Sequence, residues 1–389
     1  MHARDVDRLV MNRFLLFSWG DRTISDQLIR TENRPSGFDY LRLFLSISVI
    51  WVHSISICYG LDVALEMWRG PLHPMVRFIV PSFFALSGFL VAGSLERNTI
   101  LAFLTLRFLR IFPALCVEVL ISALLLGPLL TSLSLSDYFS HPEFWRYLGN
   151  IVGWVHLYLP GVFENRPPPH YVNGSIWTVP FELECYAAIA ALGIAGLSKR
   201  PILFTSVAFI AMLVFSAKGG TFAVISRVGG ELIIVSLGRG ELILPFMFGV
   251  AIYLVRNLLP FSLLLFVLSL TLSYVLVYFR PTSYLAAPFV AYSTAYMGLL
   301  NPRRTLLVRG AEYSYGIYLY GYPFQQAAFQ LLPGGTFWLL NIVYGVLSSG
   351  AAAYLSWIFV EKRVLDWRSA ALLRVANFIE WLSLLFRRL

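Results

Sequence analysis

The two residues best suited to catalysis lie in one apolar segment, FDYLRLFLSISVIWVHS, which carries Arg42 near its start and His53 eleven residues later. On a helix, eleven steps of about 100° return the chain to within about 20° of the same face, about 16 Å further along the axis. We therefore expect both side chains to point into one cavity. Imidazole suits the removal of a hydroxyl proton near neutral pH, and a histidine at membrane depth usually faces the protein interior or water. A hydrogen-bonded structural histidine is an equally good explanation of the residues alone.

Two more arginines, Arg107 and Arg110, lie three residues apart just before an apolar run and are followed by Pro113. Residues at this spacing are neighbours on a helix, and guanidinium groups match the geometry of phosphate oxygens. The pair can therefore anchor a phosphorylated donor molecule on the cytoplasmic side. The alternative is that both arginines only determine the topology of the chain.

Two carboxylates, Glu182 and Glu184, enter another apolar run within residues 173–186. Carboxylates are costly to bury at this boundary, so we expect at least one of them to face an aqueous cavity. The competing explanation is simple placement at the membrane interface, with Trp177 and Tyr186 as part of an aromatic belt.

The elements that must position these residues are membrane helices. Of 389 residues, 58% are hydrophobic and 13% are charged, whereas soluble domains are about 45–50% apolar and about 25% charged. Apolar stretches long enough to cross a hydrocarbon core of about 30 Å recur along the chain. The composition therefore predicts an all-α, polytopic membrane bundle of about ten transmembrane helices. The predicted spans are residues 39–60, 74–94, 111–131, 179–196, 202–215, 241–255, 261–279, 283–300, 312–332 and 337–360.

The net charge of +9 comes from arginines scattered through the loops between the apolar runs. Because they do not gather on one face of a soluble module, we expect no nucleic-acid partner. With the amino terminus inside, most lysines and arginines fall on the cytoplasmic side. The positive-inside rule then places both termini in the cytoplasm.

Three regions follow from this pattern. Residues 1–36 form an arginine-rich cytoplasmic segment without a signal peptide, residues 37–363 form the membrane domain, and residues 364–389 form a basic amphipathic tail along the inner interface. Residues 132–178 are too rich in Pro, Asn and Trp for a simple span, so we expect a loop packed over the outer mouth. Glycines interrupt the apolar stretch of residues 221–240, and they could equally mark a re-entrant or broken helix.

The three cysteines, Cys58, Cys116 and Cys185, lie in or beside apolar runs and form no CxxC motif. No histidine lies near them at ligand spacing. We therefore expect buried, inert thiols and no metal site.

Together these segments resemble the membrane acyltransferase-3 family, which O-acylates carbohydrates and some other small acceptors. The resemblance spans residues 39–363. The matching segments are Arg42 and His53 (Arg-x10-His), residues 82–90 (FFxLSGFL), Arg107 and Arg110 (RxxR followed by proline), residues 177–186 (WSLxxExxFY, with Glu182 as the family glutamate), residues 313–320 (SYxIYLxH) and residues 360–363 (xExP).

Two positions depart from the family pattern. The late histidine of SYxIYLxH is Gly321 in this chain, and the proline after the closing glutamate is missing. The late histidine is therefore not essential here. Within residues 82–90, the small side chains are better explained by close helix packing than by catalysis.

The resemblance implies an acyl-CoA donor, most often acetyl-CoA, whose phosphates dock at Arg107 and Arg110. His53 would act as a general base toward a sugar hydroxyl or as a transient acyl carrier. Arg42 would hold the donor's polar arm or stabilise developing negative charge, and Glu182 would orient the acceptor or His53. The implied acceptor is a glycan or lipid-linked sugar, such as an exopolysaccharide or O-antigen unit. The resemblance also implies a location in a bacterial inner membrane, whose lipid is the other partner.

Some family members are fused to an SGNH esterase-like domain, which this chain has no room for. It would complete the transfer alone or hand acyl groups to a separate partner. Two other classes of function stay open. A transporter or flippase of lipid-linked sugars predicts internal repeats and paired broken helices. A non-catalytic membrane scaffold is compatible with the departure at Gly321.

Overall fold

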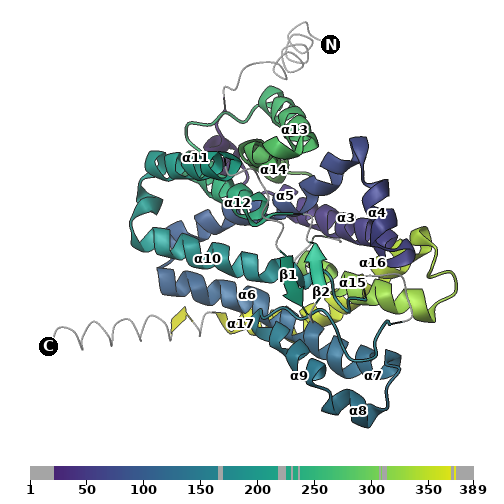
Figure 1. The fold of residues 1–389 in the computed structure, drawn as a ribbon. Coiled ribbons are helices and arrows are strands. Elements are labelled where there is room, and N and C mark those ends of the chain that lie inside the picture. The colour runs from purple at the N-terminus through teal and green to yellow at the C-terminus, as the bar shows by residue number, and fades with distance from the viewer. Residues whose placement is uncertain are drawn as a thin grey trace, which may run out of the picture.

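The computed structural model describes residues 22–164, 170–217, 225–228, 231–234, 237–305, 308, 313–368 and 372–373. Over these residues the protein is a bundle of helices with one short antiparallel hairpin (Figure 1). The predicted helical bundle is therefore confirmed for the described residues.

Ten helices of 13 residues or more form the bundle. They are α3 (Gly37–Tyr59), α5 (His73–Arg97), α6 (Ile100–Ile121), α10 (Val179–Ile194), α11 (Pro201–Ala217), α12 (Arg239–Leu254), α13 (Leu263–Tyr278), α14 (Ala287–Leu299), α15 (Tyr313–Leu331) and α16 (Trp338–Ser356). Each predicted span overlaps one of them. Shorter helices are α2 (Ile24–Arg30), α4 (Leu61–Met67), α7 (Gly127–Leu130), α8 (Leu135–Ser140), α9 (Pro142–Leu148) and α17 (Lys362–Asp366).

Four helical segments among the described residues are long and apolar enough to cross a membrane. They are Gly37–Tyr59, Gly70–Arg97, Ile100–Leu130 and Trp338–Asp366, and α11 and α13 are shorter apolar helices. The protein is thus a membrane protein. The count of ten spans and the side of each terminus remain predictions.

The FFxLSGFL-like segment of α5 packs closely against α12. A Cβ atom at Gly88 would lie 2.1 Å from the carbonyl oxygen of Phe246, and one at Gly249 would lie 2.1 Å from that of Ala85. Only glycine allows the two backbones to approach this closely, as in helix pairs packed in lipid. This confirms the packing explanation for Gly88.

Helix α6 differs from the prediction at its start. Thr99 caps it by accepting a hydrogen bond from the backbone N–H of Ala102 at 3.3 Å, and the helix continues through Pro113. Arg107 and Arg110 therefore lie within α6 and not in a connection before it. The predicted span began too late because a hydropathy window is interrupted by two arginines.

The glycine-interrupted stretch contains a short hairpin. Strands β1 (Ile225–Val228) and β2 (Glu231–Ile234) pair antiparallel there, which is neither of the two helical alternatives that the glycines left open. The rest of residues 218–236 lies outside the described residues, as do residues 1–21 of the amino-terminal segment and most of the predicted amphipathic tail.

The predicted outer loop contains α8 and α9 and then a largely extended chain. Figure 1 shows α7, α8 and α9 together at one end of the bundle. The Tyr138 hydroxyl donates to the carbonyl of Ala123 at 2.7 Å, and the amide of Asn173 donates to the carbonyl of Leu319 at 2.9 Å. These buried contacts fix the loop on the π-helical turn Ser122–Leu126, which follows α6, and on α15.

Candidate active site

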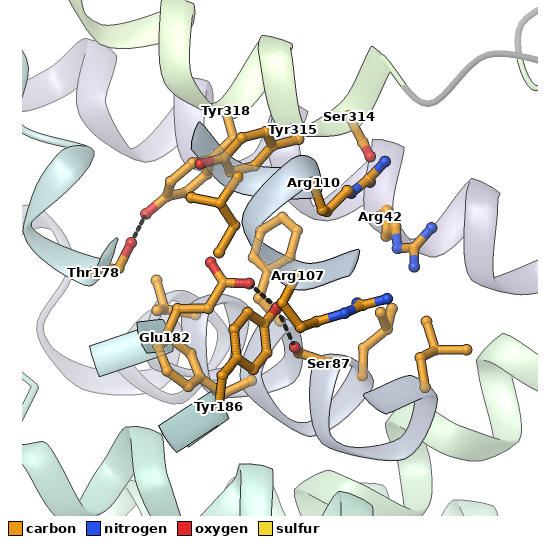
Figure 2. Close-up of a pocket in the computed structure, with 16 residues that line it drawn as sticks. Arg42, Ser87, Arg107, Arg110, Thr178, Glu182, Tyr186, Ser314, Tyr315 and Tyr318 are labelled. Atoms are coloured by element: carbon orange, nitrogen blue, oxygen red, sulfur yellow. Dashed lines mark hydrogen bonds between the residues drawn. The ribbon is translucent and has the colours of Figure 1, made fainter. Parts of the chain in front are cut away.

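A small pocket of about 120 Å³ lies where α3, α5, α6, α10 and α15 meet (Figure 2). Its polar lining residues are Arg42, Ser87, Arg107, Arg110, Thr178, Glu182, Tyr186, Ser314, Tyr315 and Tyr318. Phenylalanine and aliphatic side chains complete the wall. The pocket therefore combines three cationic groups and one carboxylate within an apolar frame.

Glu182 and Tyr186 lie one turn apart on α10 and face the same side. The Tyr186 hydroxyl donates a hydrogen bond to Oε1 of Glu182, and its oxygen lies 3.3 Å from the Ser87 hydroxyl. The guanidinium carbon of Arg107 lies 5.9 Å from the centre of the Tyr186 ring, within cation–π range. Tyr186 thus joins the carboxylate of α10 to the arginine of α6.

The opposite wall of the pocket comes from the first turns of α15. The hydroxyls of Tyr318 and Thr178 are 2.8 Å apart, and Tyr318 also donates to the carbonyl of Ser175 at 3.0 Å. These contacts join α15 to the beginning of α10. At the end of the pocket near the predicted outer loop, the Tyr318 hydroxyl therefore joins α15 to Thr178 and Ser175.

A second, larger cavity of about 600 Å³ shares Arg42, Leu90, Arg107 and Arg110 with the small pocket. The charged residues around it are Arg34, Asp39, Arg42, Arg97, Arg107, Arg110, Arg304 and Arg368. Seven arginines against one aspartate make a strongly cationic site. A polyanion, above all a molecule with several phosphates, is the ligand class that this charge favours.

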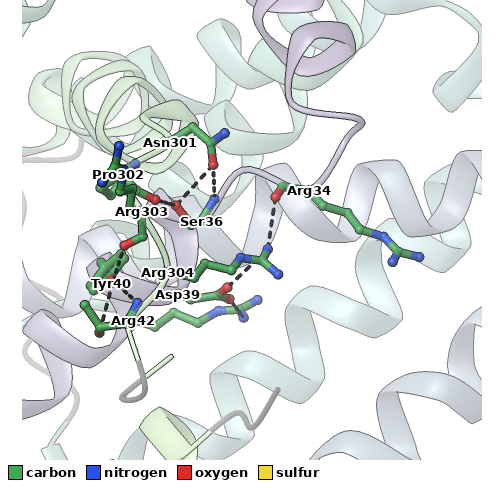
Figure 3. A network of polar contacts seen from close by, with 10 residues as sticks. Arg34, Ser36, Asp39, Tyr40, Arg42, Asn301, Pro302, Arg303 and Arg304 are labelled. Carbon is green, nitrogen blue, oxygen red and sulfur yellow. Dashed lines mark hydrogen bonds and ion pairs between the residues drawn. The ribbon is translucent and has the colours of Figure 1, made fainter. Parts of the chain in front are cut away.

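Asp39 holds two of these arginines in place (Figure 3). Its carboxylate lies 3.7 Å from a guanidinium nitrogen of Arg42 and 3.8 Å from one of Arg304. Arg304 also donates to the carbonyl of Arg34 at 3.0 Å. Asp39 thus positions one arginine of its own helix, Arg42, and one from the chain after α14, Arg304.

The same region ties the start of α3 to the chain after α14. The backbone N–H and the hydroxyl of Ser36 both donate to the side-chain oxygen of Asn301 at 3.1 Å. The Tyr40 hydroxyl donates to the carbonyl of Arg303 at 2.8 Å and accepts from the N–H of Thr305 at 2.9 Å. Residues 301–305 and the first turn of α3 therefore form one hydrogen-bonded unit (Figure 3).

His53 lies elsewhere on α3. Its ring contacts Tyr322 edge to face, with centres 4.9 Å apart, and its buried Nδ1 has no hydrogen-bond partner among the described residues. His53 does not belong to the lining of either cavity described above. The expectation that Arg42 and His53 open onto one cavity is therefore not met by these two cavities.

The structure does bring together the other four predicted site residues. Arg42, Arg107, Arg110 and Glu182 all line the small pocket. Glu184, the second carboxylate of the segment, instead pairs with Arg239 at 2.7 Å. One of the two glutamates thus faces a cavity, as expected.

Several polar residues of the pocket were not predicted. Tyr315 and Tyr318 come from the SYxIYLxH-like segment and Thr178 from the WSLxxExxFY-like one. The three-residue spacing of the two tyrosines, which places them on one helix face, is a signal that could have identified them.

Gly321, one of the two departures from the family pattern, and Glu361, the closing glutamate of the segment that lacks the proline, are both buried. A Cβ atom at Gly321 would lie 2.8 Å from Cγ1 of Ile50, so α3 occupies the space of a side chain there. The carboxylate of Glu361 accepts a hydrogen bond from the Ser356 hydroxyl at 3.0 Å. The closing glutamate therefore has a structural partner without the proline that usually follows it.

Comparison with known proteins agrees with this geometry. The acyltransferase domain family matches residues 36–361. An O-acetyl transferase of Shigella phage Sf6 is 27% identical over 349 residues, which cover 86% of this chain and 97% of that protein. No solved structure matches. The chain therefore belongs to the acyltransferase family, and the protein is a membrane acyltransferase.

Proposed function

We propose that the protein is an O-acetyltransferase that moves an acetyl group from cytoplasmic acetyl-CoA to a hydroxyl of a bacterial glycan, such as an exopolysaccharide or O-antigen unit. The observation that carries the proposal is the cavity of seven arginines that adjoins a small pocket with one carboxylate. The similarity to a phage O-acetyl transferase supports the acetyl group and the oxygen acceptor.

The two cavities suit the two ends of an acyl-CoA. The phosphates require cationic partners, which the large cavity supplies. The thioester end is uncharged and narrow, and it suits the small pocket of about 120 Å³. Arg42, Arg107 and Arg110 line both cavities and would hold the pyrophosphate between them.

In the proposed reaction, the sugar oxygen attacks the thioester carbonyl, a C–O bond forms and the C–S bond breaks. The thiolate leaves and takes up a proton as free CoA. In this direct transfer, His53 removes the hydroxyl proton. Alternatively, a ring nitrogen of His53 attacks the thioester first, so that a C–N bond forms as the C–S bond breaks, and the sugar oxygen then attacks the acetyl-imidazole as the C–N bond breaks. Arg42 either holds the donor's polar arm with Arg107 and Arg110 or stabilises the oxyanion, and Glu182 orients the acceptor or His53.

The proposal places the basic cavity on the cytoplasmic side of an inner membrane. Helix α5 ends, and α3 and α6 begin, beside the cavity. Ten spans over residues 37–363 with both termini inside would give this orientation. The glycan would then reach His53 from the other side, along the segment packed on α15.

Replacing His53 by Ala tests the catalytic assignment. We expect the acetyl content of surface glycan to fall to background while the abundance of the protein in the membrane stays normal. The exposed histidine His141, outside both cavities, gives a matched control as His141→Ala. Unchanged acetylation in His53→Ala would remove His53 from the mechanism.

A transfer assay with purified protein separates the enzyme from the other two classes of function. We expect labelled acetyl to move from acetyl-CoA to the glycan. Movement of glycan without transfer of label would favour a transporter. Neither transfer nor movement, with folded protein, would favour a scaffold.

A further inference from the structure

The arginines of the large cavity form two tiers. The inner tier, which lines both cavities and is partly buried, is Arg42, Arg107 and Arg110. The outer tier, which lines only the large cavity and is exposed, is Arg34, Arg97, Arg304 and Arg368. The cationic charge therefore extends beyond what a single pyrophosphate at the inner tier needs.

Few carboxylates in the lining of the cavity neutralise the positive charge of the outer tier. Asp39 is the single carboxylate among the residues described for the cavity lining, and it lies between Arg42 and Arg304. Glu96, the neighbour of Arg97 in the chain, forms hydrogen bonds with Arg256 and Tyr253 instead. A second anion is needed to balance this end of the cavity.

Part of the outer tier is also held in position before any ligand binds. Arg304 contacts Asp39 and the carbonyl of Arg34, and its loop is bound to α3 through Ser36 and Tyr40. Binding groups that are already ordered lose little entropy when a ligand arrives. An exposed lysine or arginine on a free loop would lack this advantage.

We propose that Arg304, Arg97 and their outer-tier neighbours bind the 3′-phosphate of coenzyme A, so that the protein selects acyl-CoA over donors that lack this group. This rests on the proposed acyl-CoA donor. A phosphate monoester carries about −1.5 to −2 charges at pH 7 and presents three acceptor oxygens to arginine. Dephospho-CoA and a carrier-bound phosphopantetheine lack this monoester and leave the outer tier unbalanced.

The test is equilibrium binding of CoA and of dephospho-CoA to the purified full-length protein in detergent, at one fixed salt concentration. We expect CoA to bind at least about tenfold more tightly, since a hydrogen bond to a charged group contributes about 1.5–3 kcal/mol. In Arg97→Gln/Arg304→Gln, the affinity for CoA should fall to that for dephospho-CoA. The affinity for dephospho-CoA should stay unchanged, which shows that the variant is folded.

The matched control is Lys199→Gln/Arg200→Gln, which removes two exposed cationic groups outside the cavity lining. It should keep the preference for CoA. Equal binding of CoA and dephospho-CoA by the unmodified protein would overturn the 3′-phosphate site and leave the donor class intact. Binding of neither would instead reject the proposed donor. Loss of the preference in the control would show that overall charge, and not this site, causes it.

Discussion

The carboxylate of Glu182 lies at a depth where an unpartnered charge is expensive. The Tyr186 hydroxyl donates a hydrogen bond to it, and three arginines line the same pocket (Figure 2). Since Tyr186 also contacts Ser87 and lies beside Arg107, one hydroxyl fixes where the carboxylate points. Glu182 therefore depends on Tyr186 for its orientation.

Tyr186→Phe tests this dependence. Losing one hydrogen bond to a charged group costs about 1.5–3 kcal/mol, so we expect kcat for acetyl transfer to fall roughly tenfold or more. The affinity for CoA should change little, because the ring that faces Arg107 is retained. Steady-state kinetics with CoA binding on the same preparation measure both.

The control for this substitution is Tyr344→Phe, since the Tyr344 hydroxyl is exposed and bonds only to a loop carbonyl, that of Pro333 at 3.1 Å. It should leave kcat unchanged. If Tyr186→Phe reduced CoA binding and kcat equally, Tyr186 would belong to the donor site and would not position Glu182.

Residue types and spacing predicted four lining residues of the pocket, because Arg42, Arg107, Arg110 and Glu182 are charged groups within apolar runs. They could not predict the tyrosines, since Tyr315 and Tyr318 are ordinary in a membrane helix until α15 packs beside α6. They also could not place His53. Two residues on one face of α3 share a cavity only if the neighbouring helices leave one open along its length.

At the scale of the helices, α5 and α12 depend on two glycines. The close approach of their backbones brings Ser87 and Phe83 of α5 to the small pocket. A bulkier residue at Gly88 would push against a backbone carbonyl, which cannot move aside as a flexible side chain can. The position of this pocket wall therefore follows from the size of one residue.

Gly88→Ala should destabilise the protein by about 1–3 kcal/mol, the usual cost of overpacking. We expect a lower thermal unfolding temperature in detergent and less protein in the membrane. Gly350→Ala is the control, because nothing lies within 4 Å of a Cβ at this position of α16. Alanine there should be neutral or stabilising by about 0.5–1 kcal/mol. Equal stability of both variants would show that the α5 and α12 contact tolerates separation.

Hydropathy located the helices well and their ends less well. Each predicted span overlaps a helix, since long apolar runs in the chain become helices in lipid. The start of α6 was missed because its first half carries two arginines, Arg107 and Arg110, which line both cavities. A window that averages all faces of a helix cannot recognise such a polar face.

At the scale of the whole molecule, the proposed donor site is a cavity lined by seven arginines. Raising the salt concentration from about 50 mM to about 500 mM shortens the range of electrostatic interactions several-fold. We expect the affinity for CoA to fall at least tenfold over this range, measured by equilibrium binding. Acetyl-pantetheine, which has no phosphate, should bind with little salt dependence. Parallel salt dependence of the two ligands would contradict a phosphate-reading cavity.

The Tyr318 contacts with Thr178 and Ser175 also have an electrical consequence. An enzyme that admits a donor from one face of a membrane and an acceptor from the other must not short-circuit the membrane potential, which is worth about 2.3 kcal/mol per elementary charge at 100 mV. A basic cavity open to water on the donor side is safe only if ions stop at its inner end. The hydroxyl contacts of Tyr318 lie in the small pocket, at the inner end of the proposed donor site. We therefore expect the same few atoms that shape this pocket to keep ions from crossing the membrane through it.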